Sequence, residues 1–171
     1  MDADQLRALQ APVKMRYKED PVAARVTLKA SGSLDAPGIA CKVETGRAVV
    51  TAGLHPATGG DGLAACSGDM LLEALVGCAG VTLRAVATAL GVPLRGGTVS
   101  AEGDLDFRGT LGGSKEVPVG FQEIRLRFDL DSDASPEQLE SLLKLTERYC
   151  VVFQTLKQAP SMRIACGKRP G

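Results

Sequence analysis

Five cysteines and one histidine are the residues of this 171-residue chain best suited to nucleophilic or redox chemistry. Cys78 lies in the apolar stretch LLEALVGCAGVTLRAVATAL (71–90), and Cys150 lies in RYCVVFQTL, 72 residues further on. The cysteines do not form a C-x-x-C pattern, so no zinc site of known spacing is predicted. A cysteine that binds no metal is either a small buried hydrophobic residue or a reactive thiol.

Cys78 raises this choice most directly because its neighbours are so small. Gly77, Ala79 and Gly80 add almost no bulk beside the sulfur, and each glycine costs a helix about 1 kcal/mol relative to alanine. Close approach of another helix would compensate, and so would room for a small substrate. A reactive thiol also needs a positive field, because an ordinary cysteine is only a few per cent ionised at neutral pH. Arg84 points away from Cys78 on a helix, so we expect an arginine from another segment.

The other cysteines and the histidine carry weaker signals. Cys41 at a strand start, Cys66 in a glycine-rich loop and Cys166 near the chain end are interpreted as packing residues. Cys66 precedes Cys78 by twelve residues at the helix entrance, so contact with that thiol is the alternative interpretation for it. His55 in GLHPATGGDG is either an acid/base group or a loop histidine with an ordinary hydrogen bond.

The spacing of apolar residues predicts the elements that must position these side chains. The glycine-rich segment 53–69 is expected to be a long loop leading into the cysteine helix, and 31–38 a turn. The order of strands, helix, two strands, helix pair and strand indicates the α+β class. The predicted strands are 24–30, 40–44, 47–52, 98–107, 121–130 and 161–166, and the predicted helices are 2–10 (ended by Pro12), 71–90, 135–150 and 151–158.

Capping residues predict where the two long helices begin and end. Ser135 and Gln138 form a capping box for the later helix. Ser67 or Asp69 is predicted to cap the cysteine helix, and Gly91 to end it. Because the cysteine helix is apolar on every face, we expect it to be buried all round, between layers or across a dimer.

Charge and composition exclude several classes of function. Twenty basic and twenty acidic residues cancel without a long run of either sign, so we expect no nucleic-acid or anionic-membrane partner. The first twenty residues lack the apolar core of a signal peptide, and a cytoplasmic location is expected. Residues 70–90 are long enough to span a bilayer, but Glu73 and Arg84 within them argue against it. A single main domain is expected from the length.

Two segments of the chain resemble a known family. SGDMLLEALVGCAGVTLRAVA (67–87) and ERYCVVFQTLKQAP (147–160) are similar to the two cysteine segments of the OsmC/Ohr family, thiol-dependent peroxidases that reduce organic hydroperoxides. The resemblance implies an OsmC-like domain over 22–168, and the short helix predicted near the N-terminus is interpreted as part of an arm over 1–21. It also implies an antiparallel sheet wrapped around a central buried cysteine helix, in an intertwined homodimer with active sites at the subunit interface.

The same resemblance implies roles for two residues in defence against oxidative stress. Cys78 falls on the family's peroxidatic cysteine, which attacks the hydroperoxide and becomes a sulfenic acid. Cys150 falls on the resolving cysteine, which condenses with that sulfenic acid to a disulfide. A dithiol reductant, of lipoyl type in the family, then restores both thiols, and no cofactor is implied.

Three positions depart from the family's pattern. The turn where the family's arginine is expected reads SGSLDAPG, and it is flanked only by Arg25 and Arg47. The place of a glutamate ten residues before the cysteine is Gly68, with the shorter Asp69 beside it. Proline often follows the second cysteine in the family, whereas this chain has Val151. What ionises Cys78 is therefore the question that the sequence leaves for the structure.

Two other hypotheses fit the sequence. The chain could be a non-enzymatic OsmC-fold protein that binds a small hydrophobic ligand at its dimer interface, with the cysteines as packing residues. A static disulfide between Cys78 and Cys150 would in principle stabilise the fold by about 4 kcal/mol through loop entropy, but the reducing cytoplasm argues against it.

Overall fold

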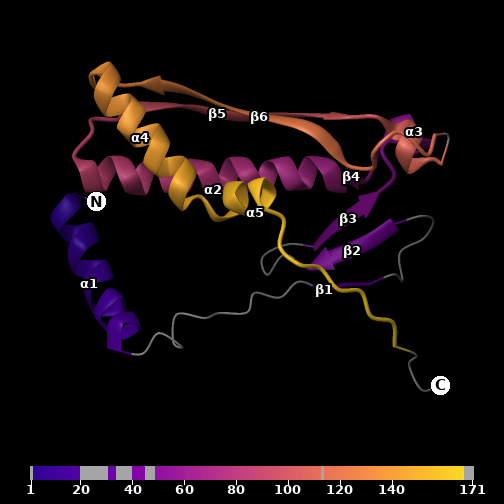
Figure 1. Cartoon of the computed structure of the whole chain (residues 1–171), viewed down its shortest axis with the longest axis horizontal. Coiled ribbons are helices and arrows are strands. Elements are labelled where there is room, and N and C mark those ends of the chain that lie inside the picture. Colours follow the sequence, from indigo (N-terminus) through magenta and orange to yellow (C-terminus); the bar gives the residue numbers. More distant parts are fainter. Residues whose placement is uncertain (1, 20–30, 34–39, 45–48, 113, 168–171) are drawn as a thin grey trace.

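A computed structural model describes residues 2–19, 31–33, 40–44, 49–112 and 114–167 of the chain. Helix α2 (Ser67–Leu90) is its longest element and runs along one side of a long two-stranded ribbon (Figure 1). The ribbon consists of β5 (Gly96–Leu105) and β6 (Phe121–Asp131). Two further helices, α4 (Pro136–Tyr149) and α5 (Val151–Lys157), pack against α2. The result is a mixed α+β fold, as the order of predicted elements indicates.

Strands β5 and β6 form an antiparallel hairpin that confirms the strands predicted at 98–107 and 121–130. Their register runs from Gly96 opposite Asp131 to Leu105 opposite Phe121, with an irregularity near its end. Alternate residues of β6 are half-buried and exposed, as expected for a sheet with one face on the core. The half-buried residues of this strand are Phe121, Ile124, Leu126, Phe128 and Leu130.

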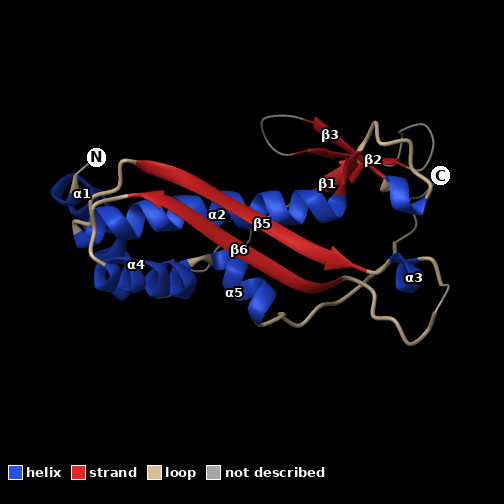
Figure 2. Cartoon of the chain, turned by 90° about the horizontal axis from the view of Figure 1, so that it is seen from above, coloured by secondary structure: helices blue, strands red, loops and turns tan. Residues whose placement is uncertain are grey.

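A second, four-stranded sheet lies near the N-terminal end of α2 (Figure 2). Its order is β1 (Ser31–Ser33), β2 (Ala40–Glu44), β3 (Val49–Gly53) and β4 (Ala65–Cys66). The antiparallel pairing of β2 with β3 confirms the predicted hairpin. The turn predicted over 31–38 is wrong for its first three residues, because they pair with β2 and backbone hydrogen bonding outweighs their weak strand propensity. The strand predicted at 24–30 lies outside the described residues.

The predicted loop over 53–69 contains more regular structure than its glycines indicate. It includes a 3₁₀ turn, η2 (Pro56–Thr58), and strand β4, which passes directly into α2. The N-cap of α2 is Cys66, without a side-chain cap, so the predicted caps at Ser67 and Asp69 are wrong. Because β4 runs directly into α2, Cys66 has the extended backbone conformation that an N-cap residue needs. The Asp69 carboxylate lies in the first turn of the helix, where negative charge is favourable. At the other end Gly91 adopts φ 67° and ends the helix as predicted.

Helix α2 is buried along one stripe and open on another. Leu75, Ala79, Leu83 and Ala87, each four residues apart, are at most 3% exposed. Val81, on the other side of the helix, is 73% exposed. The expectation that this helix is buried on every face is therefore wrong for a single copy of the chain. By length and apolar composition the helix could also cross a membrane, but here its buried stripe packs against protein.

The ends of the chain differ from the sequence prediction. Helix α1 (Ala3–Glu19) continues through Pro12, because a proline removes one backbone hydrogen bond without always ending a helix. It contacts α2. Residues 158–167 form no strand, so the strand predicted at 161–166 is wrong: no described strand lies beside it to pair, and Ile164 is fully exposed.

The capping box that begins α4 is present as predicted. The Ser135 hydroxyl accepts a hydrogen bond from the Gln138 backbone N–H at 3.3 Å, and the Gln138 side chain accepts one from the Ser135 N–H at 2.9 Å. Leu142 of this helix is fully buried with Leu83 and Ala87 of α2. This contact fixes α4 on α2 and thereby sets where its C-terminal residue lies.

Candidate functional site

The structure brings Cys78 and Cys150 together from segments far apart in the sequence. Cys78 lies in the middle of α2, while Cys150 ends α4 and begins α5 in an extended conformation. Cys150 is 1% exposed and is buried with Leu75 and Ala79, and the half-buried Cys78 packs against the same cluster. Both are free thiols.

Hydrogen bonds around the Cys78 sulfur favour its thiolate. Burial is the largest single effect on its pKa and would raise it. The backbone N–H of Val152, the Cys150 thiol, the backbone N–H of Val151 and the Thr82 hydroxyl act in the opposite direction. Together these donors outweigh burial, so the pKa of Cys78 is lowered below that of an ordinary thiol.

Cys150 responds in the opposite way. Burial raises the pKa of its thiol, and the hydrogen bond to Cys78 and the negative charge there raise it further, against the opposing backbone N–H groups of Phe153 and Val152. When the pair carries a single negative charge, these opposite shifts of the two pKa values favour the thiolate at Cys78 and the protonated thiol at Cys150. A nucleophile beside a protonated partner thiol is the arrangement that disulfide-forming chemistry needs.

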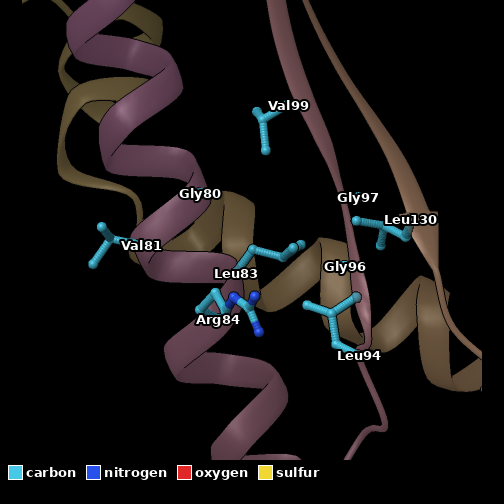
Figure 3. Close-up of a pocket in the computed structure, with 9 residues that line it drawn as sticks. All are labelled: Gly80, Val81, Leu83, Arg84, Leu94, Gly96, Gly97, Val99 and Leu130. Carbon is cyan, nitrogen blue, oxygen red and sulfur yellow. The ribbon is translucent and has the colours of Figure 1, made fainter.

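No described arginine acts on the Cys78 sulfur, so the expected arginine from another segment is not found among residues 49–112 and 114–167. Arg84 on the same helix lies instead beside β5 (Figure 3). Arg125 and Arg127 of β6 are engaged by carboxylates. Arg25 and Arg47, which flank the turn in the sequence, lie outside the described residues.

The sequence missed three of the groups that act on Cys78. Thr82 lies one helical turn beyond Cys78, so the spacing of i and i+4 could have identified it. The N–H groups of Val151 and Val152 had no such signal, because only the packing of α5 on α2 brings them to the sulfur. Val151 stands where the family often has proline, which would have no N–H to donate.

The two glycines beside Cys78 differ in their surroundings. A Cβ at Gly80 would lie 3.7 Å from the Val99 side chain, so this glycine is in ordinary contact with β5. A Cβ at Gly77 would meet nothing within 4 Å among the described residues. Nothing in the described part of the chain therefore requires a glycine at position 77.

The remaining candidates lie away from the cysteine pair. Cys66 begins α2, and at about 1.5 Å of rise per residue it is roughly 18 Å from Cys78, so it does not reach that thiol. Cys166 is exposed, so the interpretation as a packing residue is wrong for it in this chain. His55 accepts a hydrogen bond from the Ala57 N–H at 3.0 Å, which favours the ordinary loop role. The side chain of Cys41 lies outside the described part of the structure.

Two of the cavities that border α2 in the described part of the structure lie near the middle of this helix. One, of about 280 Å³, lies between β6, α4 and α5 and is lined by Cys150. The other, of about 380 Å³, lies between α2 and β5, and all nine residues around it except Arg84 are glycine or apolar (Figure 3). Among the described residues, no three metal-ligating side chains form a cluster that could hold an ion.

The sequence model of the OsmC-like protein family matches residues 59–165, which include both cysteines and most of the described fold. The chain belongs to the OsmC-like family. No match was found among curated proteins.

Solved structures show the same OsmC-like fold. The OsmC-like protein of Mycoplasma pneumoniae is 15% identical, with a TM-score of 0.65 over 78% of this chain and 89% of that one. An organic hydroperoxide resistance protein of Elizabethkingia anophelis is 14% identical, with a TM-score of 0.63 over 80% and 91%. An organic hydroperoxide resistance protein of Legionella pneumophila is 17% identical, with a TM-score of 0.61 over 79% and 92%. At these identities the similarity establishes the fold alone.

Proposed function

We propose that this OsmC-like protein is a thiol-dependent peroxidase that reduces organic hydroperoxides in defence against oxidative stress. The observation that carries the proposal is the placement of Cys78 and Cys150 in one buried cluster, where the pKa of Cys78 is lowered and that of Cys150 is raised. Structural relatives named as organic hydroperoxide resistance proteins support the same reaction class.

The proposed reaction uses Cys78 as the peroxidatic residue. Its thiolate attacks one oxygen of the peroxide, the S–O bond forms as the O–O bond breaks, and the alkoxide leaves as an alcohol after protonation. Cys150 then attacks the sulfenic acid, so that a disulfide forms and water leaves. A dithiol reductant supplies two electrons and two protons that restore both thiols.

We further propose that the protein works as an intertwined homodimer in which α2 becomes the central helix, wrapped by the sheets and covered by the second copy. The exposed Val81 and the otherwise unexplained Gly77 of α2 support this, because a second helix could approach closely there. Residues 1–21 would form an arm and 22–168 the OsmC-like domain. A cytoplasmic location would keep the four described free cysteines reduced.

Rapid mixing of the reduced protein with tert-butyl hydroperoxide tests the peroxidase proposal. We expect a rate well above that of a free thiol, loss of the reaction in Cys78→Ser, and a Cys78–Cys150 disulfide detected by mass spectrometry. The Cys150→Ser variant should still consume one equivalent of peroxide and should accumulate sulfenic acid that dimedone labels. A rate no better than free thiol, unchanged in Cys78→Ser, would refute the proposal.

The cavity between α2 and β5 favours a second candidate function. Its apolar wall and the guanidinium of Arg84 suit a small hydrophobic ligand that carries a negative charge (Figure 3). In that case the protein is a non-enzymatic binder, and calorimetry should detect dodecanoate binding that weakens about tenfold in Arg84→Gln through loss of a charge-assisted hydrogen bond. Stoichiometric formation of the disulfide by peroxide would count against this alternative.

A further inference from the structure

We propose that the reducing dithiol attacks Cys150 rather than Cys78, and that it enters through the cavity between β6, α4 and α5. This inference rests on the proposed disulfide between the two cysteines. The cavity has a volume of about 280 Å³, near the lower limit of ordinary small-molecule sites.

This cavity borders one cysteine only, and the 1% exposed Cys150 lies at its inner wall. Cys150 and Ala79 line it, whereas Cys78, the next residue to Ala79 on α2, does not. Successive residues of an α-helix are turned by about 100°, so Ala79 faces the cavity while Cys78 faces Thr82 and the start of α5. Of the two cysteines, only Cys150 therefore borders a molecule held in this cavity.

The chemical character of the lining indicates the kind of reductant. Its wall is mostly apolar, and its charged member, Glu147, is bound through Oε1 to Lys157 Nζ at 2.6 Å. A dithiol on a hydrocarbon chain is suited to such a wall, whereas a hydrophilic dithiol is not. The apolar residues of the wall are Ala79, Leu126, Phe128, Leu143 and Phe153.

The exchange reaction favours the same direction of attack. A thiolate of the donor bonds to the Cys150 sulfur, the S–S bond breaks, and Cys78 leaves as a thiolate. The second donor thiol then attacks the donor sulfur of the mixed disulfide, which oxidises the donor and releases Cys150 as a thiol. The donor loses two electrons, the protein disulfide gains them, and the two donor protons end on the protein thiols or in solvent. The N–H groups of Val152 and Val151 and the Thr82 hydroxyl, which favour the Cys78 thiolate, make it the better leaving group.

Trapping on the unaltered chain tests which sulfur is attacked. The disulfide is made with diamide, so that the test does not depend on the peroxide reaction. Oxidised protein is mixed with 2-mercaptoethanol, quenched within milliseconds by N-ethylmaleimide, and mapped by mass spectrometry. We expect the mixed disulfide on Cys150 and the maleimide on Cys78. The reverse assignment, or the absence of any Cys78–Cys150 disulfide after diamide, would overturn the inference.

Obstruction of the cavity tests the route. Leu143 lines the cavity and is 39% exposed, so the Leu143→Trp variant can place a larger ring at the opening without disturbing the core. We expect dihydrolipoamide to reduce the diamide-oxidised variant about tenfold more slowly than the unaltered protein, because a narrowed channel misplaces the donor.

Leu111→Trp is the matched control, because Leu111 is 62% exposed on a loop remote from this cavity. Its rate of reduction should equal that of the unaltered chain. Equal slowing in both variants, or none in Leu143→Trp, would reject this route. If the protein fails to reduce the peroxide but the trapping experiment still finds the mixed disulfide on Cys150, the peroxidase proposal is rejected. The proposed attack on Cys150 then stands.

Discussion

The pKa of Cys78 is lowered by donors from two segments that are far apart in the sequence. Thr82 belongs to the same helix as Cys78, whereas Cys150, Val151 and Val152 belong to the junction of α4 and α5. Hydrogen bonds to a thiolate favour the ionised form even where burial opposes it. The reactivity of Cys78 therefore depends on single donor groups that can be removed one at a time.

Replacement of Val151 by proline removes one of these donors and little else. Val151 is the first residue of α5, a position at which proline is well tolerated, so the helix should persist. We expect the pKa of Cys78 to rise in Val151→Pro, which leaves less thiolate at any pH below that pKa. The midpoint of the pH dependence of iodoacetamide alkylation should move upward, and the rate at pH 7 should fall about two- to tenfold for one lost hydrogen bond.

Val151→Ala is the control for this change, because it retains the backbone N–H. Its alkylation profile should match that of the unaltered protein. If both variants behave alike, the N–H of residue 151 does not stabilise the thiolate.

The Thr82 hydroxyl gives a second test on the helix itself. Thr82→Val keeps the shape of the side chain but removes the donor, so the pKa of Cys78 should rise and alkylation at pH 7 should slow by about two- to tenfold. Thr88→Val is the matched control, because the Thr88 hydroxyl donates to the Arg84 carbonyl at 2.8 Å and does not act on Cys78. Equal rates in the two variants would contradict a role for Thr82.

Among the elements, the junction between α4 and α5 matters most for the site. Leu142 fixes α4 against α2, and the extended Cys150 then starts α5 so that its first N–H groups meet the Cys78 sulfur. Anything that loosens the start of α4 should weaken this packing. The capping box is the local feature that holds that start.

Loss of the cap should destabilise the protein measurably. Ser135→Ala removes the acceptor for the Gln138 N–H and should lower the free energy of unfolding by about 1 kcal/mol, measured by urea denaturation. Ser141→Ala makes the same chemical change at an exposed position within α4, where alanine is the better helix former. Stability should be equal or slightly higher in this control, and equal losses in the two variants would exclude the cap as the cause.

For the whole molecule, the open face of α2 is the feature that one chain leaves unexplained. A long apolar helix with its inner stripe buried still exposes Val81, and a Cβ at Gly77 would meet nothing within 4 Å among the described residues. Apolar surface of this kind is favourable to cover, and a second copy of the chain is the proposed cover.

A charge on this face should disrupt the proposed dimer. Val81→Lys would place an ammonium group in an apolar interface. Sedimentation equilibrium should therefore show that the dissociation constant of the dimer rises about tenfold or more. Val119 is 72% exposed on a loop, almost the same as the 73% of Val81, so Val119→Lys is a closely matched control. The control should keep the assembly of the unaltered chain; a monomer for all three proteins would refute the dimer.

Local patterns in the sequence were sufficient for most of the elements. Alternation predicts β5 and β6, because each strand places its side chains on opposite faces. The capping box predicts the start of α4, since cap and partner lie three residues apart. The errors arose where pairing with another strand decides the structure. Residues 31–33 and β4 each have a strand to pair with, whereas residues 161–166 are in neither described sheet.

The sequence by itself determined the fold class and the α2 and α4 helices and, through the resemblance, indicated the two cysteines of the proposed site. Only the tertiary structure decided what surrounds Cys78. Its donors at Val151 and Val152 are backbone N–H groups. Every residue except proline carries such a group, so the sequence does not show which of them act on the Cys78 sulfur. Their effect on Cys78 exists only because α4 and α5 pack against α2 and bring those N–H groups to its sulfur.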